Sequence, residues 1–363
     1  MPLLRVNRRF VVLVVTAIAI TAISGYLHHP STPALFGIWG LKYNDIVYGV
    51  FHPIFGTETL NSYEKLSERW FHPEILERLS SGTKLCPLPY VDYKFEYPPL
   101  VGALWSLTTC VSIYLAFPDH YTRLDYPDLI DRVATLHFEF QAAVLGVSFI
   151  FLVYILYRIA MLLGVGWKRV LLFVLLPSTT IYLVYNWDIL AAVLMIGGLY
   201  AFLRRKYVVS GILFGLAIGA KLLPAAPALV LLYELLQRKL RGEESEHLIN
   251  YTISLAITAL APFALLILFA PQGFSAMIQH HASWYCENCI YMLINPQDLW
   301  SSFHRIAAMI LIPFSLLLLA TKPLDSPRAT VSIAAAAITS TTLFNYVFSP
   351  QMMLMLTPLL VLV

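Results

Sequence analysis

The sequence predicts an all-α polytopic membrane protein, a single domain built as a bundle of about ten transmembrane helices. Of its 363 residues, 59% are apolar and only 12% are charged, and the mean hydropathy is +0.72. A soluble domain carries about a quarter charged residues. Apolar windows recur along the chain, and basic residues return at every second connection between them. Together these observations place the chain in a lipid bilayer.

Apolar windows give the expected spans, because about 20 apolar residues cross a bilayer as a helix. The windows cover 10–27, 138–157, 170–185, 189–203, 208–220, 224–236, 249–270, 303–320, 329–347 and 352–363. The first resembles a secretory signal, but no small-residue cleavage site follows it, so we expect a retained span. The last runs to the final residue, and we expect a further C-terminal segment beyond it.

Basic clusters predict which ends of the spans face the cytoplasm. The clusters are Arg5, Arg8 and Arg9; Arg158, Lys168 and Arg169; Arg204, Arg205 and Lys206; Arg238, Lys239 and Arg241; and Lys322 with Arg328. Because they fall at alternate ends of successive spans, the N-terminus of this multi-pass protein of the cell membrane is expected in the cytoplasm. A first loop over 28–137 and a second loop over 271–302 are then expected on the extracytoplasmic face.

The segment 100–117 does not fit this alternation. It is apolar enough to cross the membrane, but a crossing would move every later basic cluster to the outside. We therefore expect a helix that lies on or dips into the outer interface, with a true span as the alternative. The acidic residues that follow it fit an exterior location; they are Asp119, Asp125, Asp128 and Asp131.

Asp45 is the candidate catalytic residue of the first loop. It lies shortly after the first span, among Trp39, Tyr43, Tyr48 and His52. A carboxylate just above a bilayer can take a proton from a hydroxyl if its neighbours hold its pKa and its orientation. The alternative is a helix cap, because Asp before an apolar run is a common N-terminus.

A second acidic group follows in the stretch from Pro89 to Leu100. Asp92 and Glu96 flank Lys94, and a proline pair then presets the start of a helix. The two carboxylates could contact an acceptor, or Lys94 could simply neutralise them. A rigid interfacial turn that sets tyrosines at the level of the lipid headgroups explains the same residues.

Two ionisable residues lie at the ends of spans. Asp188 follows Asn186-Trp187, and Lys221 precedes Pro224. Ionisable groups at membrane depth are costly and usually line a site or a pathway. Lys221 facing a cavity would pair with a phosphate, because ammonium and phosphate attract strongly where water is scarce. Alternatively, Lys221 extends to the surface.

The second loop concentrates His280, His281 and Glu287 near Cys286 and Cys289. Adjacent histidines rarely point the same way, so we expect phosphate or sugar contact and no metal site. The CxxC pair also lacks the second Cys or His pair of a zinc site. The cysteines are expected to form a local disulfide or a link to Cys86, and a redox motif is the weaker alternative.

Other classes of function are excluded by what the sequence lacks. The net charge is only +3, from 24 basic and 21 acidic residues, so nucleic acid is not an expected partner. No glycine-rich phosphate loop occurs, and we expect neither a nucleotide site nor a cofactor.

Taken together, the motifs resemble the polyprenol-phosphate-mannose-dependent mannosyltransferases, membrane glycosyltransferases of the GT-C fold. The resemblance rests on Asp-Ile in the first loop, Pro-Tyr-x-Asp-Tyr-x-x-Glu-Tyr-Pro-Pro-Leu at 89–100, Asn-Trp-Asp at 186–188, Gly-x-x-x-x-x-Lys-x-x-Pro at 215–224 and Phe-Ser-Pro-Gln at 348–351. It implies a GT-C-type fold, Asp45 as the catalytic base, and a second outer loop between the seventh and eighth spans that holds the lipid phosphate. His280 to Asn288 occupy that position.

The implied enzyme is a hexosyltransferase. It moves a hexose, by resemblance mannose, from a polyprenyl phosphate to a glycolipid or glycan acceptor among the membrane lipids. Phosphate leaves as an anion, so one carboxylate base suffices and inversion is expected; glycoside hydrolysis instead needs two carboxylates. We expect Lys221 with His280 or His281 at the donor phosphate. We expect the acceptor to be contacted, or the groups that contact it to be supported, by Asp92, Lys94, Glu96, Asp188 and Glu287.

Two alternatives to this enzyme remain. A transporter or flippase would also carry scarce ionisable groups, usually near the midplane and in repeated halves. A non-catalytic assembly subunit is the other.

Overall fold

The computed structural model describes residues 8–322 and 324–363, so Arg5 of the first basic cluster lies outside the described residues. The helices before the long helix α8 are α1 (Arg8–His28), η1 (Leu35–Gly37), α2 (Trp39–Lys42), η2 (Asp45–Phe51), α3 (His52–Phe55), α4 (Thr57–Leu60), α5 (Tyr63–Arg69), α6 (Pro73–Ser80) and α7 (Pro99–Ala116). From α8 onward they are α8 (Tyr126–Leu163), α9 (Trp167–Leu175), α10 (Pro177–Tyr182), α11 (Asp188–Leu203), α12 (Tyr207–Ala220), α13 (Ala225–Leu240), α14 (Ser245–Phe269), α15 (Pro271–Ser283), η3 (Ile290–Leu293), α16 (Ser302–Ala320), α17 (Pro327–Phe344), η4 (Pro350–Met352) and α18 (Met353–Leu360).

Five of these helices, α1, α7, α8, α14 and α16, are long and apolar enough to cross a membrane. The helices α11 and α12 and the segment Pro350–Leu360 are shorter but also apolar. Within the described residues, extended structure is limited to isolated bridges. The prediction of an all-α polytopic membrane protein is therefore confirmed.

Most expected spans coincide with helices, but the window 170–185 is broken into α9 and α10 at Pro177. Proline lacks an amide hydrogen and disfavours the helical conformation of the residue before it, and Leu176 is accordingly extended, with φ −61° and ψ 137°. The nine residues of α9 rise only about 13 Å, less than a bilayer core. The prediction of one continuous span here is wrong.

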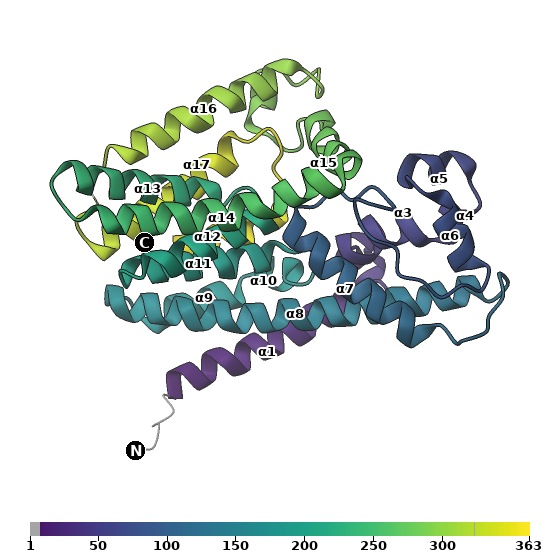
Figure 1. Ribbon diagram of the computed structural model, residues 1–363. Helices are drawn as coiled ribbons and strands as arrows, with labels where there is room; N and C mark the ends of the chain where they lie inside the picture. Colours follow the sequence, from purple (N-terminus) through teal and green to yellow (C-terminus); the bar gives the residue numbers. More distant parts are fainter. Residues whose placement is uncertain (1–7, 323) are drawn as a thin grey trace.

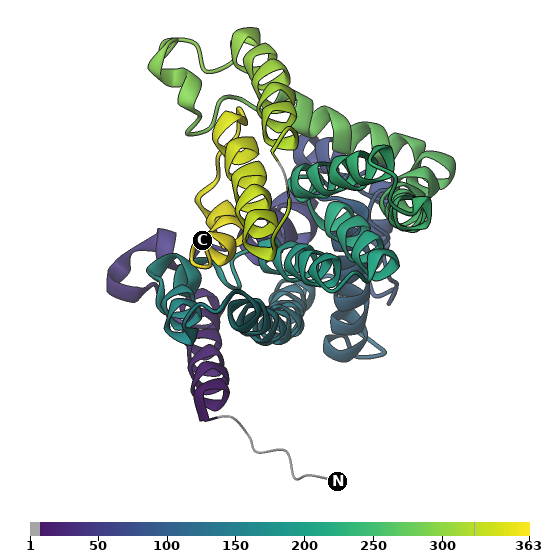
Figure 2. The ribbon, with the colours of Figure 1, turned by 90° about the vertical axis from the view of Figure 1, so that its left-hand side faces the viewer.

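The bundle has two chemically different ends (Figure 1). At one, here called the basic end, Arg328 donates to the Leu163 carbonyl and Arg238 to the Leu324 carbonyl. The helices α8, α11, α13 and α16 end there. At the other, here called the loop end, α1 and α12 end and α11 and α13 begin. Figure 2 looks along the bundle and shows most of its helices nearly end-on.

The helix α7 packs on the N-terminal half of α8, beyond the loop end of the bundle (Figure 1). Trp105 of α7 lies edge-on to His137 of α8, with ring centroids 4.4 Å apart, and the Gln141 amide donates to the Thr108 hydroxyl at 2.8 Å. Leu100 at the start of α7 lies beside Gly219 in the last turn of α12. The placement of 100–117 at the membrane interface stays a prediction.

Two disulfides are formed. Cys286 pairs with Cys289, so the prediction of a local bridge is confirmed. Cys86 pairs with Cys110 of α7, with Cα atoms 5.2 Å apart, so the alternative of a link from Cys86 to the second loop is wrong. The sequence did not reveal this pairing, because Cys110 lies inside the apolar helix α7, which folds back along the first loop.

The helices α12 and α14 approach closely through small residues, as is common in membranes. A Cβ atom on Gly215 would lie 2.8 Å from the backbone nitrogen of Ala259, and closer still to the Thr258 hydroxyl. Gly211, one turn earlier, faces Ser254 and the Tyr251 carbonyl in the same way. Any side chain at these two positions therefore forces the helices apart.

We predict that Gly215→Ile destabilises the protein by about 1–3 kcal/mol, because overpacking a close helix contact displaces backbone. Thermal unfolding in detergent measures the effect as a lower melting temperature. The matched control is Gly25→Ile, because nothing lies within 4 Å of a Cβ at that position. Equal melting temperatures for the two variants would contradict the α12–α14 contact.

Candidate functional site

Asp45 is the first residue of η2, a short π-helix that begins at the loop end of the bundle. Asn44, not Asp45, caps this helix: its side-chain oxygen accepts from the Val47 amide at 2.7 Å, and its Nδ2 donates to the His28 carbonyl at 3.0 Å. The alternative that Asp45 serves as the cap is therefore wrong. The Asp45 amide donates to the Tyr185 carbonyl at 2.9 Å, which joins η2 to the segment before α11.

The Asp45 carboxylate is held by side chains from three segments. The Tyr97 hydroxyl donates to Oδ2 at 2.9 Å, and Asn186 Nδ2 lies 3.5 Å from the same oxygen. The Tyr43 hydroxyl also hydrogen-bonds to Asp45. Gly49 leaves room for this group, because a Cβ there would lie 3.1 Å from Oδ1 and 2.7 Å from the Tyr43 oxygen.

Burial raises the pKa of Asp45 to about 6, against an ordinary value of 3.8. The hydrogen bond from Tyr97 lowers the pKa, the charge of Glu96 raises it, and the charge of Lys221 lowers it. The carboxyl group therefore changes protonation state near neutral pH, as a general base requires.

Lys221 and Asp188 form an ion pair at the loop end, where α12 ends and α11 begins. The Asp188 side chain is 1% exposed and that of Lys221 is 21% exposed. The Asp188 amide donates to the Asn186 side-chain oxygen at 3.0 Å, so Asn186 contacts both Asp45 and the residue that fixes Lys221. Among the described residues, the second carboxylate oxygen of Asp188 is buried with no hydrogen-bond partner.

The two histidines of α15 meet Glu96. His281 Nε2 contacts the Glu96 carbonyl oxygen at 2.8 Å, and His280 Nε2 lies 3.3 Å from the Glu96 carboxylate. Burial raises the pKa of Glu96 to about 7, while the charge of Arg69 lowers it. Burial and then Arg69 lower the pKa of His280. Both directions favour the uncharged forms of Glu96 and His280, which lie within ion-pair distance of each other.

His281 also lies near Lys221. Its pKa is lowered chiefly by burial, and the charges of His280 and Lys221 lower it further. Lys221 acts electrostatically on both Asp45 and His281, so the structure brings these three predicted site residues into one neighbourhood.

Asp92 and Lys94 shape the first loop. The Asp92 carboxylate accepts from the Leu88 amide at 2.6 Å, and its carbonyl accepts from Phe71 and His72. The Lys94 side chain is exposed, while its amide donates to the Arg69 carbonyl at 2.8 Å. Their hydrogen bonds therefore go to the loop itself.

Glu287 joins the second loop to the late Phe-Ser-Pro-Gln stretch. Its carboxylate accepts from Trp284 at 3.1 Å and lies 3.5 Å from the Ser349 hydroxyl, and its carbonyl accepts from the Phe348 amide at 2.8 Å. The Tyr346 hydroxyl donates to the His281 carbonyl at 2.6 Å. The end of the chain thus supports the histidines of α15.

A polar cavity of about 510 Å³ lies between the first loop and the start of α8. It is lined by Tyr48, His52, Pro53, Gly56, Thr57, Glu58, Thr59, Lys65, Glu68, Arg69, Pro127, Ile130 and Asp131. Tyr48 stacks on Tyr43, the partner of Asp45, with ring centroids 6.3 Å apart. Arg69 lines the cavity and also acts electrostatically on Glu96, so Tyr48 and Arg69 link the cavity wall to the site residues.

The family model described as Glycosyltransferase family 87 matches residues 133–362, more than half of the chain. The chain belongs to glycosyltransferase family 87. Neither a curated protein nor a solved structure matches it. The chain is therefore a membrane glycosyltransferase.

The region matched to glycosyltransferase family 87 contains part of the site. Asp188, Lys221, His281 and Glu287 lie within it, whereas Asp45 comes before it. Analysis of the sequence missed Tyr97, Tyr43, Asn186 and Arg69 as site residues. Tyr97 and Asn186 lie within the motifs that carried the resemblance, while no sequence signal indicates Arg69.

We predict that Asp45→Asn stabilises this family 87 glycosyltransferase at pH 8. The pKa of the carboxyl is raised on folding, so its ionised form costs the folded state free energy above about pH 6; this cost shrinks as the pH falls and is absent below about 3.8. We expect a gain of about 2–3 kcal/mol at pH 8 and little change near pH 4. Melting temperatures at both pH values measure it.

The matched control for this stability test is Glu74→Gln, which neutralises an exposed carboxylate of α6. A gain for Asp45→Asn that is the same at pH 4 and pH 8 would show that charge burial is not its cause.

Proposed function

We propose that this glycosyltransferase moves a hexose, with mannose as the first candidate, from a polyprenyl phosphate to a hydroxyl group of a glycolipid or glycan. The observation that carries the proposal is a carboxylate with a pKa of about 6, Asp45, beside Lys221 and His281 at the loop end of an apolar bundle. A lipid-linked donor requires a site at the end of such a bundle, because its isoprenoid tail stays in the bilayer.

Asp45 acts as the general base in this proposal. Efficient bases have a pKa near the working pH, and burial brings Asp45 there. Hydrogen bonds from Tyr97 and Tyr43 orient the carboxylate toward the acceptor hydroxyl. Displacement by a single base inverts the anomeric carbon.

In this proposal Lys221 supplies the positive charge that stabilises the departing phosphate. Lys221 keeps two ammonium hydrogens for a phosphate beyond the one it donates to Asp188. His280 and His281 contact Glu96 and border the phosphate in this proposal, and the charge of Arg69 acts on Glu96. Preorganised donors at the position where negative charge develops contribute a large share of catalysis in a site with little water.

The acceptor binds in the polar cavity beside Tyr48. Its volume of about 510 Å³ falls within the range of small-molecule sites, about 300–1,000 Å³. Its lining offers the carboxylates of Glu58, Glu68 and Asp131 to sugar hydroxyls and the aromatic ring of Tyr48 to a sugar face. Asp92, Lys94 and Glu287 support the loops around this site.

The site faces the extracytoplasmic side in this proposal. The basic clusters lie at the end of the bundle opposite Asp45, and Lys and Arg favour cytoplasmic connections. The donor, the acceptor and the surrounding lipids would all meet at the outer leaflet, and the N-terminus would be cytoplasmic.

We predict that Asp45→Asn lowers transfer from radiolabelled polyprenyl-phosphate-mannose to membrane lipids by about 10²–10⁴-fold, because a general base contributes that much. Purified protein in detergent serves for the measurement, with Glu74→Gln as the control that should transfer normally. The melting temperature of Asp45→Asn shows that it is folded. Unchanged transfer would remove Asp45 as the base, and transport without transfer would favour a flippase.

We predict that Tyr97→Phe shifts the acid limb of the pH profile upward by about one unit. The Tyr97 hydrogen bond lowers the pKa of Asp45, so its loss raises that pKa. The control is Tyr121→Phe, which loses a hydrogen bond to the Leu79 carbonyl away from the site. A profile that keeps its midpoint while the rate falls would assign Tyr97 to substrate contact instead.

A further inference from the structure

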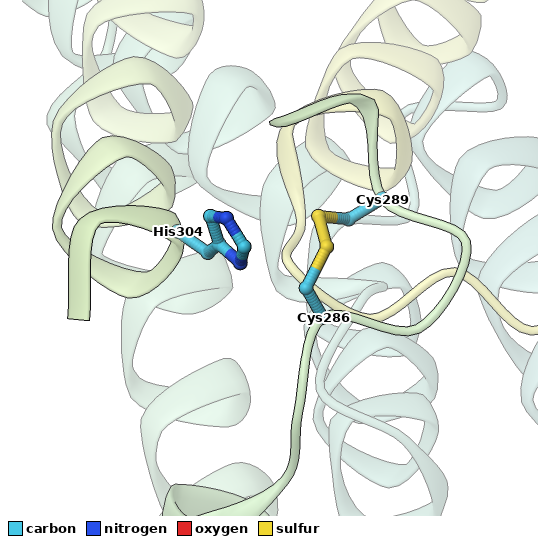
Figure 3. Close-up of side chains that lie close together, drawn as sticks. All are labelled: Cys286, Cys289 and His304. Carbon is cyan, nitrogen blue, oxygen red and sulfur yellow. A yellow bond between two sulfur atoms is a disulfide. The ribbon is translucent and has the colours of Figure 1, made fainter. Parts of the chain in front are cut away.

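A cluster of three buried side chains lies apart from Asp45, in the second loop. Cys286 and Cys289 are 2% and 5% exposed, and His304 in the first turn of α16 is 1% exposed. One ligand-type atom from each residue lies within 4.8 Å of the others. Figure 3 shows the His304 ring facing the bond between the two sulfur atoms.

The His304 imidazole has no hydrogen bond in the part of the chain that the structure describes, and both of its ring nitrogens are buried. Its surroundings are apolar or aromatic: Tyr291 stacks on it with ring centroids 6.3 Å apart, and Ala308 belongs to the same cluster. Burying an unpaired polar group is costly, and such groups in proteins usually have a partner. The imidazole therefore lacks the partner that its position requires.

We propose that Cys286, Cys289 and His304 bind a thiolate-preferring divalent metal ion, zinc first of all, when the two cysteines are reduced. Zinc favours cysteine sulfur and histidine nitrogen in tetrahedral geometry, and two cysteines separated by two residues are a common half of such a site. His304 supplies the third ligand, and a water molecule completes the tetrahedron. The ion also gives the imidazole its missing partner.

The disulfide is the oxidised, metal-free state of the same cluster. A dithiol reductant transfers two electrons and two protons to the Cys286–Cys289 bond and is itself oxidised to a disulfide. Zinc then binds two thiolates and neutral His304, and the two thiol protons pass to solvent. A two-electron oxidant reverses the sequence and expels the ion.

The cluster holds the loop that supports the proposed donor site. The Cys286 amide donates to the Leu299 carbonyl at 2.8 Å, and the adjacent Glu287 pairs with the strand-like segment at Phe348. Tyr346 packs against the cluster and donates to the His281 carbonyl. Both the disulfide state and the metal-bound state therefore fix the second loop. Only the metal-bound state also bonds this loop to α16, through His304.

The test uses the full chain in detergent, reduced with a phosphine, freed of metal and then titrated with zinc chloride against a chromophoric chelator. We expect one zinc ion per reduced chain and none per oxidised chain. Cobalt(II) in place of zinc should give the intense visible bands of a tetrahedral ion with sulfur-to-metal charge transfer. Reduced wild-type protein that takes up no zinc overturns the proposal.

His304→Phe identifies the third ligand, because it keeps an aromatic ring in the apolar cluster and removes both nitrogens. We expect zinc affinity to fall at least about 100-fold, since removing even a residue that only orients a ligand costs about 10–100-fold. The control variant Cys86→Ser/Cys110→Ser removes the other disulfide and should keep one zinc site. Full affinity in folded His304→Phe, or a lost site in the control variant, contradicts the assignment.

Discussion

The burial of one carboxylate governs the site. Asp45 is held at the meeting point of segments far apart in the chain: Tyr97 approaches from the first loop, and Asn186 from the start of α11. Burial alone favours the protonated form of this carboxyl group. The hydrogen bond from Tyr97 and the charge of Lys221 oppose that effect and keep its pKa near 6.

The charge of Glu96 has the opposite effect on the pKa of Asp45 from that of Lys221. Its contacts with His280 and His281 also join the first loop to α15. Its charge raises the pKa of Asp45, yet its own pKa is raised by burial to about 7, and its carboxylate lies 3.3 Å from His280 Nε2. Protonation of the Glu96–His280 pair therefore makes Asp45 a weaker base, and ionisation of Glu96 makes it a stronger one.

Much of the fold could be predicted from the sequence, because hydropathy and basic residues report directly on lipid contact. The helices α11, α12 and α14 begin and end within a few residues of the expected windows. The break at Pro177 was missed because an apolar window does not register one proline. The Cys86–Cys110 bridge depends on α7 folding back along its own loop, which no local pattern reveals.

Part of the candidate site could be predicted for a similar reason. Asp45, Lys221 and His281 stand out as scarce ionisable residues at the ends of spans, and rarity in an apolar chain is visible in sequence. The ion pair of Lys221 with Asp188 and the role of Arg69 are long-range contacts between different segments. Uncharged donors such as Tyr97 and Asn186 are common residues, so only the folded geometry distinguishes them.

The backbone conformation at Tyr90 positions the first loop against α15. Tyr90 adopts a left-handed conformation with φ 67°, which is costly for a bulky residue, and its hydroxyl donates to the Tyr97 carbonyl at 2.6 Å. A Cβ on Gly102 of α7 would collide with the Tyr90 ring, and one on Gly273 of α15 would lie 2.5 Å from its Cα. Gly102 and Gly273, on separate helices, thus both leave room for Tyr90. Because Tyr90 hydrogen-bonds to the Tyr97 carbonyl on one side and contacts α15 on the other, packing around Tyr90 sets the distance between Asp45, the partner of Tyr97, and the histidines of α15.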